Sequence, residues 1–225
     1  MNSAAMMNPE MVDIEAVAIE ATDVEIVDVA FALRGETIPA DHGGKLYRLL
    51  ADRLPWLETE PHAGVHSIRG ARIGADVLHV GGRGRLMLRL PRERAEAAFA
   101  LSGTRLALGD GIELGEPRLR ALFAHGTLYS PRVTLDAEDE HAFQRRLAEA
   151  LRQAGIGCET VCGHGSRSEN EAESGAARPI AGFSVLLHGL NAAQSLAMQA
   201  RGLGAARKLG WGLFVPHRSA AAVGS

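Results

Sequence analysis

The chain has 225 residues and a mass of 23.9 kDa, which is enough for one large domain or two domains of about 100 residues. It is 46% hydrophobic and 23% charged, so its composition excludes a chain that is disordered throughout. It has neither a long apolar run nor a basic and then apolar start, so we expect a cytoplasmic protein without membrane contact. The formal net charge of −3 by itself argues against a nucleic-acid binder.

The two cysteines, Cys158 and Cys162, cannot form a framework of disulfides, which fits a reducing compartment. Together with His164 they suggest metal ligation. A structural zinc site takes four ligands, usually with a second pair at a regular spacing, and the sequence has no such pair. We therefore predict no metal and no cofactor.

Charge is distributed unevenly along the chain. Residues 1–28 carry seven acidic residues and no Lys or Arg, and residues 157–178 have a net charge of −2. The rest of the chain has a net charge of about +6, and residues 69–94 alone hold seven arginines against two acidic residues. Of the 24 basic residues 22 are Arg, whose planar fork suits phosphate. A coding bias toward Arg explains part of this excess but not its clustering.

Residues 1–24 are predicted to form an acidic tail. Apolar residues alternate over 27–33, which predicts a strand, and 42–54 has the apolar spacing of a helix that ends before Pro55. A strand pair, a strand, a helix and a strand follow, over 65–80, 83–90, 92–101 and 112–119. This βαββαβ order is ferredoxin-like.

The second half repeats this order. A strand is expected over 127–135, and 138–154 has helical spacing that ends at Gly155. Two strands follow, over 158–162 and 182–189, and a polar loop over 163–178 separates them. A helix over 191–201 and a last strand over 209–217 complete this half. We therefore predict an α+β protein of two tandem ferredoxin-like domains, over 25–120 and 121–219. An N-terminal tail over 1–24 precedes them and a C-terminal tail over 220–225 follows.

Residues 202–216 are rich in glycine. A dinucleotide fingerprint needs a strand before its glycines and a helix after them, whereas here a helix comes first and a strand follows. The pattern fits a turn whose small residues let the backbone approach a large ligand, with Arg207 and Lys208 near its phosphates. The glycines concerned are Gly202, Gly204, Gly210 and Gly212. The alternative is a tight turn whose glycines only allow close packing.

The segment GLGAARKLGWGLFVP at 202–216, followed by His217 and Arg218, resembles the C-terminal signature of the repeat-associated RNA-binding superfamily of CRISPR systems. More narrowly, the chain is similar to the sixth CRISPR-associated family, the endoribonucleases that process precursor CRISPR RNA, in its MYXAN subtype. Supporting segments lie at 27–43, 54–57, 64–72, 85–95, 127–131 and 183–199. Together they span most of residues 26–219.

This resemblance implies metal-independent RNA cleavage, in which a ribose 2′-hydroxyl attacks the adjacent phosphorus and leaves a 2′,3′-cyclic phosphate and a 5′-hydroxyl. The reaction needs a base, an acid and cations. The resemblance points to His42, at the start of the first predicted helix, as base or acid; the alternative is an ordinary exposed residue. Lys45 lies on nearly the same helical face and could stabilise phosphate charge. Tyr47 lies about 140° away and would cooperate only if the first helical turn is distorted.

Aromatic residues make up only 4% of the chain, so we do not expect RNA recognition by base stacking. Arginines that contact a duplex backbone fit better, and the hairpin of a CRISPR repeat would supply one. Arg85 and Arg89 alternate on one predicted strand face and could line a groove. Weaker candidates are Arg69, Arg72, Arg83, Arg92 and Arg94. The alternative is a solvated, charged sheet edge that discourages aggregation.

The expected partner is CRISPR repeat RNA, as the precursor and as mature crRNA, with other subunits of the interference complex if the product stays bound. The main alternative is a non-catalytic RNA-binding subunit on the same fold, which would have no need of His42 beside Lys45. A small-molecule enzyme on this fold is disfavoured by the arginine cluster.

Overall fold

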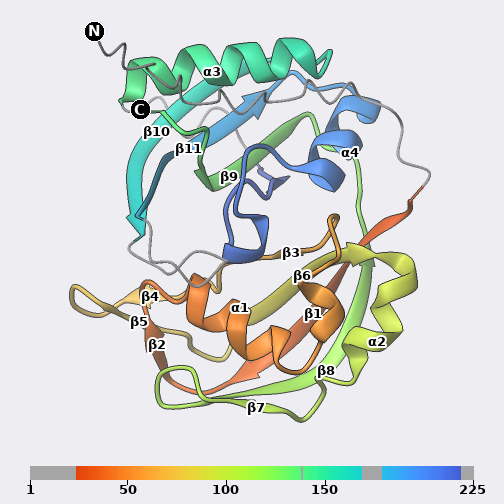
Figure 1. Cartoon of the computed structure of the whole chain (residues 1–225), viewed down its shortest axis with the longest axis vertical. Helices are drawn as coiled ribbons and strands as arrows, with labels where there is room; N and C mark the ends of the chain where they lie inside the picture. Colours follow the sequence, from red (N-terminus) through yellow and green to blue (C-terminus); the bar gives the residue numbers. More distant parts are fainter. Residues whose placement is uncertain (1–23, 138, 169–178, 219–225) are drawn as a thin grey trace, which may run out of the picture.

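The computed structural model describes residues 24–137, 139–168 and 179–218. The predicted acidic tail, the C-terminal tail and most of the predicted acidic loop therefore lie outside the described residues. Figure 1 shows two sheets, one above the other, each with its own pair of helices. No helix in the described ranges is long and apolar enough to cross a membrane.

The first sheet is antiparallel, with strand order β3-β6-β1-β8-β7. Its strands are β1 (Ile26–Arg34), β3 (Gly64–Val65), β6 (Arg85–Pro91), β7 (Arg105–Leu106) and β8 (Ile112–Ala121). Helices α1 (Gly43–Ala51) and α2 (Ala95–Phe99) lie on one face of it. Chain order β1, α1, β3, β6, α2, β8 is the predicted ferredoxin-like arrangement, and α1 forms because Leu46 and Leu50 recur on one helical face.

The second sheet has the equivalent order β10-β11-β9-β12. Its strands are β9 (Thr127–Val133), β10 (Glu159–Ser168), β11 (Ile180–His188) and β12 (Val215–Pro216), and its helices are α3 (Glu140–Gln153) and α4 (Ala192–Arg201). Asp139 caps α3 by accepting from the Ala142 amide, and Asn191 forms a capping box at α4. The repeated order confirms the α+β, ferredoxin-like fold class.

A small third sheet flanks the first and has the order β2-β5-β4, over Thr37–Pro39, Val77–His79 and Ala71–Arg72. Figure 1 shows the turn between β4 and β5 projecting from the side of the molecule. Three short 3-10 helices complete the described structure: η1 (Pro55–Leu57), η2 (Arg92–Arg94) and η3 (Arg207–Leu209).

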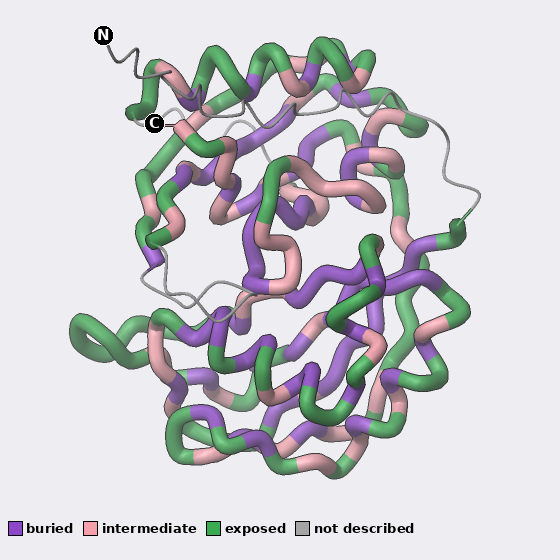
Figure 2. The backbone as a smooth tube through the Cα atoms, in the orientation of Figure 1, coloured by how far each residue is buried: buried purple, intermediate pink, exposed green. Residues whose placement is uncertain are grey.

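Each sheet has its own apolar core on the face that its helices cover. Figure 2 shows the buried residues along the central strands and on the inner sides of the helices. Leu209 and Trp211, which follow α4, belong to the core of the first sheet. The glycine-rich segment therefore leaves the second sheet, packs against the first, and returns to form β12.

Two sequence-based expectations differ from the structure. The predicted polar loop from residue 163 is wrong at its start, because β10 continues to Ser168, paired with Ile180 of β11. Backbone pairing holds this exposed strand without the apolar alternation that a sequence pattern detects. The predicted strand 209–217 shortens to Val215–Pro216, because Gly210 and Gly212 have φ angles of 88° and 66°.

Candidate nucleic-acid interface

The helix-free faces of the two sheets meet at a cleft of about 670 Å³. On β6, Leu86 and Leu88 point into the first core, so Arg85 and Met87 point to the opposite face and line the cleft. Tyr129 of β9 lines the cleft from the second sheet. Residues 66–70, which follow β3, form one wall.

The cleft is strongly cationic. Among the described residues, its lining includes Arg69, Arg83, Arg85 and Arg132 and contains neither Asp nor Glu. Within the described residues, no ion pair joins Arg69, Arg83 or Arg85 to a carboxylate. Unpaired guanidinium groups around a concave surface attract polyanions and offer planar donors for phosphate. Arg69, Arg83 and Arg85, which were predicted to bind RNA, thus lie at one site. Their RNA contacts remain a prediction.

Arg132 was missed by the sequence reasoning. It lies on β9, far along the chain from the arginine cluster, and only folding brings it to the cleft. Its guanidinium lies 5.8 Å from the ring centroid of Trp211, and burial lowers its pKa. No local motif marks it as a binding residue.

A smaller pocket of about 340 Å³ shares Arg132 with the main cleft. Arg72 and Arg167 line it, but so do Asp41 and Asp76, so its charge is mixed. Arg72 is exposed and donates to the carbonyl of Ala75. The predicted RNA-binding residue Arg72 therefore lies beside the main cleft and not in it.

Arg89 corrects a sequence-based expectation. Its side chain is 1% exposed; Nε and Nη2 donate to the two carboxylate oxygens of Asp28 at 2.8 and 2.9 Å. Nη1 donates to the carbonyls of Gln199 and Phe214 at 2.8 and 2.7 Å. Arg85 and Arg89 do share a strand face, but the end of α4 and the segment after it cover the end of that face. Arg89 therefore joins the two ferredoxin-like units and does not reach a groove.

His66 lines the cleft close to this ion pair. Its Nε2 is buried without a hydrogen-bond partner, 3.9 Å from Asp28 Oδ1. Burial first, and then the charge of Arg89, lower the pKa of His66 to about 3. The imidazole is therefore neutral at physiological pH. Its sequence context gave no reason to prefer it to the other histidines.

His42 is buried and not exposed, with 1% of its surface accessible. Its Nδ1 lies 2.9 Å from the Pro39 carbonyl and its Nε2 3.0 Å from the Ile68 amide nitrogen. Since the amide can only donate, Nε2 accepts and Nδ1 carries the proton. Burial also lowers the pKa of His42. The ring therefore joins the start of α1 to the cleft wall, and its catalytic role stays a prediction.

Lys45 and Tyr47 point in different directions, as their separation on the helix indicated. Lys45 is exposed on α1 and does not line the cleft. Tyr47 is 6% exposed and belongs to the core of the first sheet. The structure thus brings neither side chain to the cationic cleft, and their catalytic roles also stay predictions.

The four predicted glycines all have positive φ and closely approach other parts of the chain. A Cβ atom would lie 2.5 Å from the Gly212 carbonyl oxygen at position 202, and 2.0 Å from that of Thr134 at position 204. At position 210 it would lie 2.3 Å from Ser67 Oγ. The structure therefore supports the alternative that the glycines allow close packing of the protein itself. Gly210 is the one of the four that also lines the cleft.

Arg207 is also a structural residue. It donates to the Ala200 carbonyl at 2.8 Å and to that of Arg201, so it satisfies the C-terminal end of α4. Burial lowers its pKa to about 10. Lys208 is half-buried and donates to the Glu58 carbonyl at 2.7 Å. Neither residue lines the cleft, so the expected phosphate contacts of both find no support in its geometry.

Within the described ranges, no three His, Cys, Asp or Glu side chains gather as metal ligands do. Cys158 and Cys162 are half-buried, and burial raises the pKa of both thiols.

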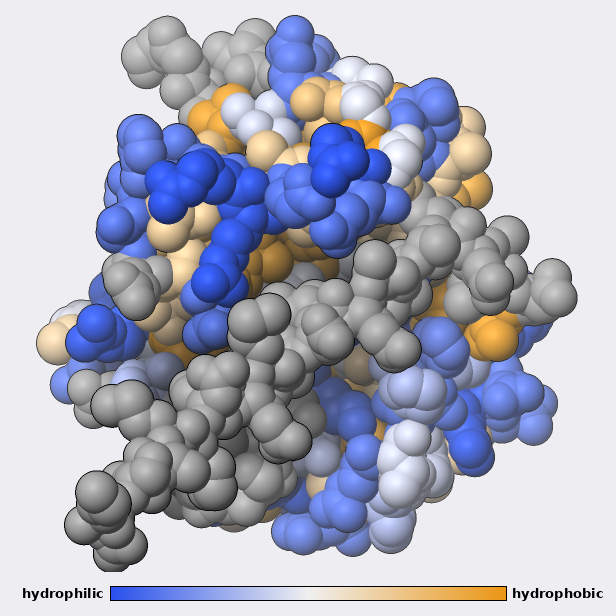
Figure 3. Space-filling model, turned by 45° about the horizontal axis from the view of Figure 1, so that its top comes forward, coloured by the Kyte–Doolittle hydropathy of each residue, from blue (hydrophilic) through white to orange (hydrophobic). Residues whose placement is uncertain are grey.

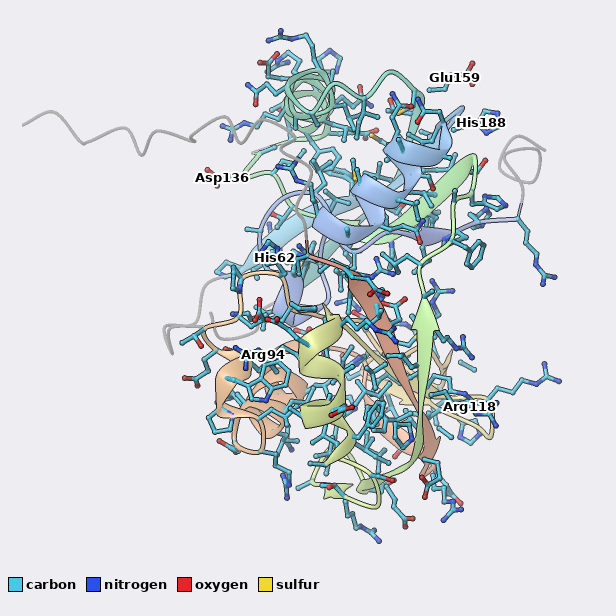
Figure 4. All side chains as sticks on the ribbon, turned by 90° about the vertical axis from the view of Figure 1, so that its right-hand side faces the viewer. His62, Arg94, Arg118, Asp136, Glu159 and His188 are labelled. Carbon is cyan, nitrogen blue, oxygen red and sulfur yellow. The ribbon has the colours of Figure 1, made fainter. Side chains whose placement is uncertain are left out.

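Figure 4 shows His188 at the outer end of β11, away from the first sheet. Its Nδ1 lies 2.8 Å from Thr127 Oγ1, so this half-buried histidine has a hydrogen-bond partner.

Gly212→Ala is expected to destabilise the fold by about 2 kcal/mol or more, because φ is positive and the new Cβ would lie 2.1 Å from the Leu203 carbonyl oxygen. Urea unfolding of both proteins measures the difference. Gly157→Ala is the matched control, since a Cβ at that position would meet no atom within 4 Å beyond its chain neighbours, and it should change stability by less than about 0.5 kcal/mol. Equal effects of the two substitutions would contradict the packing role.

Comparison with known proteins shows first a shared fold and then the family. Two solved structures share this tandem ferredoxin-like fold. One is a CRISPR-associated protein Cas6, with a TM-score of 0.58, 11% identity and coverage of 86% of this chain and 100% of that one. The other is a Cas6-related protein from Pyrococcus furiosus, with a TM-score of 0.59, 12% identity and coverage of 84% of this chain and 98% of that one. At these identities the likeness concerns the fold. The Cas6 Crispr family model matches residues 27–219, and the chain belongs to this family.

A curated relative agrees with this assignment. The chain is 34% identical over 197 residues to the CRISPR-associated endonuclease Cas6 of Myxococcus xanthus strain DK1622, which covers 87% of this chain and 83% of the relative. The resemblance to the sixth CRISPR-associated family is therefore confirmed.

Proposed function

We propose that this protein is an endoribonuclease that cuts precursor CRISPR RNA within its repeat. The observation that carries the proposal is the cleft between the two sheets, where the described part of the chain contributes four arginines and no acidic residue to the lining. The endonuclease named among its relatives supplies the reaction class. Such a cleft suits a phosphodiester backbone, because guanidinium groups bind phosphate oxygens as bidentate donors.

Cleavage is proposed to proceed by attack of a ribose 2′-hydroxyl on the adjacent phosphorus, with departure of the 5′ oxygen. The attacking oxygen belongs to the substrate, so no water has to be activated. The exposed guanidinium groups of Arg69, Arg83 and Arg85 would stabilise the additional negative charge of the phosphorane. The reaction is therefore proposed to proceed without a metal ion.

His42 is proposed to act on this reaction by positioning the cleft wall. Its Nε2 holds the amide of Ile68, and the next residue is Arg69 of the cleft. A direct proton transfer, as the family resemblance implies, would require the ring to leave this bond. The buried amide would then lose its partner, which costs about 1–3 kcal/mol.

The first experiment incubates the protein with its repeat RNA in EDTA, beside an RNA that lacks the 2′-hydroxyl upstream of the cut. Only the first RNA should be cut, with 2′,3′-cyclic phosphate and 5′-hydroxyl ends. A requirement for Mg²⁺, or cleavage of the deoxy RNA, would contradict the mechanism. Binding of both RNAs without any cutting would favour the alternative, a non-catalytic RNA-binding subunit.

His42→Ala separates the two roles of this residue. If His42 positions the cleft wall, the variant should lose stability and RNA affinity together with cleavage. Loss of cleavage alone, with RNA affinity and unfolding unchanged, would instead indicate proton transfer.

The product is proposed to remain bound as mature crRNA and to pass to other subunits of an interference complex in the cytoplasm.

A further inference from the structure

The helix-free face of the first sheet extends beyond the cleft, across β1 to β8. In the strand register, Ala30 of β1 stands opposite both Met87 of β6 and Arg118 of β8. Asp28 likewise stands opposite Arg120. Residues directly opposite each other in antiparallel strands share a face. Arg118 and Arg120 therefore lie on the same face as Met87, which lines the cleft.

Only small side chains lie on the sheet surface between Met87 and Arg118. On this face of β1, Asp28 stands between Arg89 and Arg120, Ala30 stands between Met87 and Arg118, and Ala32 follows. Gly115 of β8 approaches Ala32 so closely that a Cβ there would lie 3.3 Å from its carbonyl oxygen. Neighbouring strands lie about 4.8 Å apart, so the Cα atoms of Met87 and Arg118 are separated by roughly 10 Å. Between Met87 and Arg118, β1 therefore presents only the methyl group of Ala30.

Arg118 and Arg120 are exposed, and the described residues offer neither of them a hydrogen bond or an ion pair. Figure 4 shows Arg118 extending from β8 on the side away from α1 and α2. Glu116, two residues before Arg118, is acidic but makes no ion pair with it, and the carboxylate of Asp28 is held by Arg89. Two cations on this face thus keep their charge free for a partner.

We propose that Arg118 and Arg120 form a second RNA track that continues the cleft across β1, where they bind the backbone of the RNA segment that leaves it. This inference rests on the proposed function, because it extends the same RNA path. The occupant is polyanionic, since the track carries unpaired guanidinium groups that are continuous with a cationic cleft. Because the track binds through guanidinium groups, which contact phosphates and not base edges, its contacts should depend on RNA length and not on base sequence.

The test compares two RNAs that carry a 2′-deoxy residue at the cut: the repeat hairpin alone, and the hairpin with a single-stranded flank on either side. Affinity is measured at several salt concentrations for the wild type, for Arg118→Ala/Arg120→Ala, and for the control Arg145→Ala on α3, which is also exposed. At 0.15 M salt, the wild type should bind the flanked RNA about tenfold more tightly than the hairpin alone. The double variant should lose this gain and bind both RNAs with similar affinity. Its salt slope should fall by about 1.4, since each single-strand phosphate contact contributes about 0.7.

The proposal is overturned if the double variant binds the flanked RNA as tightly as the wild type, or if Arg145→Ala loses the same gain. It is also overturned if the double variant binds the unflanked hairpin more weakly than the wild type does, because the arginines would then act on the hairpin or on the fold. Failure of the proposed function is distinguishable: RNA that is bound with the expected flank dependence but never cut would remove the endonuclease and leave the track.

Discussion

Arg89→Ala is expected to destabilise the protein by about 3–5 kcal/mol, the largest stability effect of any single substitution considered. The guanidinium makes four hydrogen bonds inside the protein, two of them to Asp28. Its removal would leave a nearly buried carboxylate without its partner. It would also leave the carbonyls of Gln199 and Phe214 without this donor. These carbonyls belong to the second unit, so the contact between the units should loosen.

Urea unfolding, followed by tryptophan fluorescence, measures this effect. Arg92→Ala is the matched control, because Arg92 also pairs with a carboxylate, that of Glu25, but both side chains are more than half exposed. The control should change stability by less than about 1 kcal/mol. If Arg89→Ala has no larger effect than the control, the inter-unit role of Arg89 is wrong. The double variant Asp28→Asn/Arg89→Met should cost less than the sum of its single substitutions, since it removes both charges.

Arg83→Ala/Arg85→Ala is expected to weaken binding of the repeat hairpin about 30-fold at 0.15 M salt. Each lost duplex phosphate contact should also lower the slope of log affinity against log salt by about 0.9. Both side chains are exposed at the cleft and form no ion pair with any described residue, so their removal should leave the fold intact. A gel-shift or anisotropy titration at three salt concentrations gives both quantities.

Arg145→Ala serves as the control here too, because it removes one exposed positive charge, against two in the double variant, from a helix that does not line the cleft. The cleft would be the wrong RNA site if the control weakened binding as much as the double variant did. An unchanged salt slope would likewise contradict phosphate contacts by Arg83 and Arg85. Figure 3 shows hydrophilic side chains over much of another face of the molecule, so this control for general surface charge is needed.

Much of the fold could be predicted because its signals are local. The leucines of α1, the capped and amphipathic α3, and the apolar alternation of β1 each lie within one element. The order of these elements is enough for a ferredoxin-like repeat. Where a strand lacks such a pattern, as in the exposed β10, the prediction ended too early, because pairing with β11 is a tertiary contact.

The candidate site could be predicted only in part. The sequence placed Arg85 and Arg89 on one strand face, and that alternation is correct. It could not show that the end of α4 and the segment after it cover Arg89 and leave Arg85 exposed at the cleft. Arg132 was invisible to the same reasoning, since its approach to the cluster is made by the packing of two sheets.

The sequence by itself determined the element order, the excess of arginine in one region and the family signature at the glycines. The tertiary structure alone decided which arginines face the cleft, that His42 is held by two backbone groups, and that the glycines approach protein backbone. The physical reason is that periodicity fixes the face on which a side chain lies, whereas its burial and its partners depend on what the rest of the chain packs against that face.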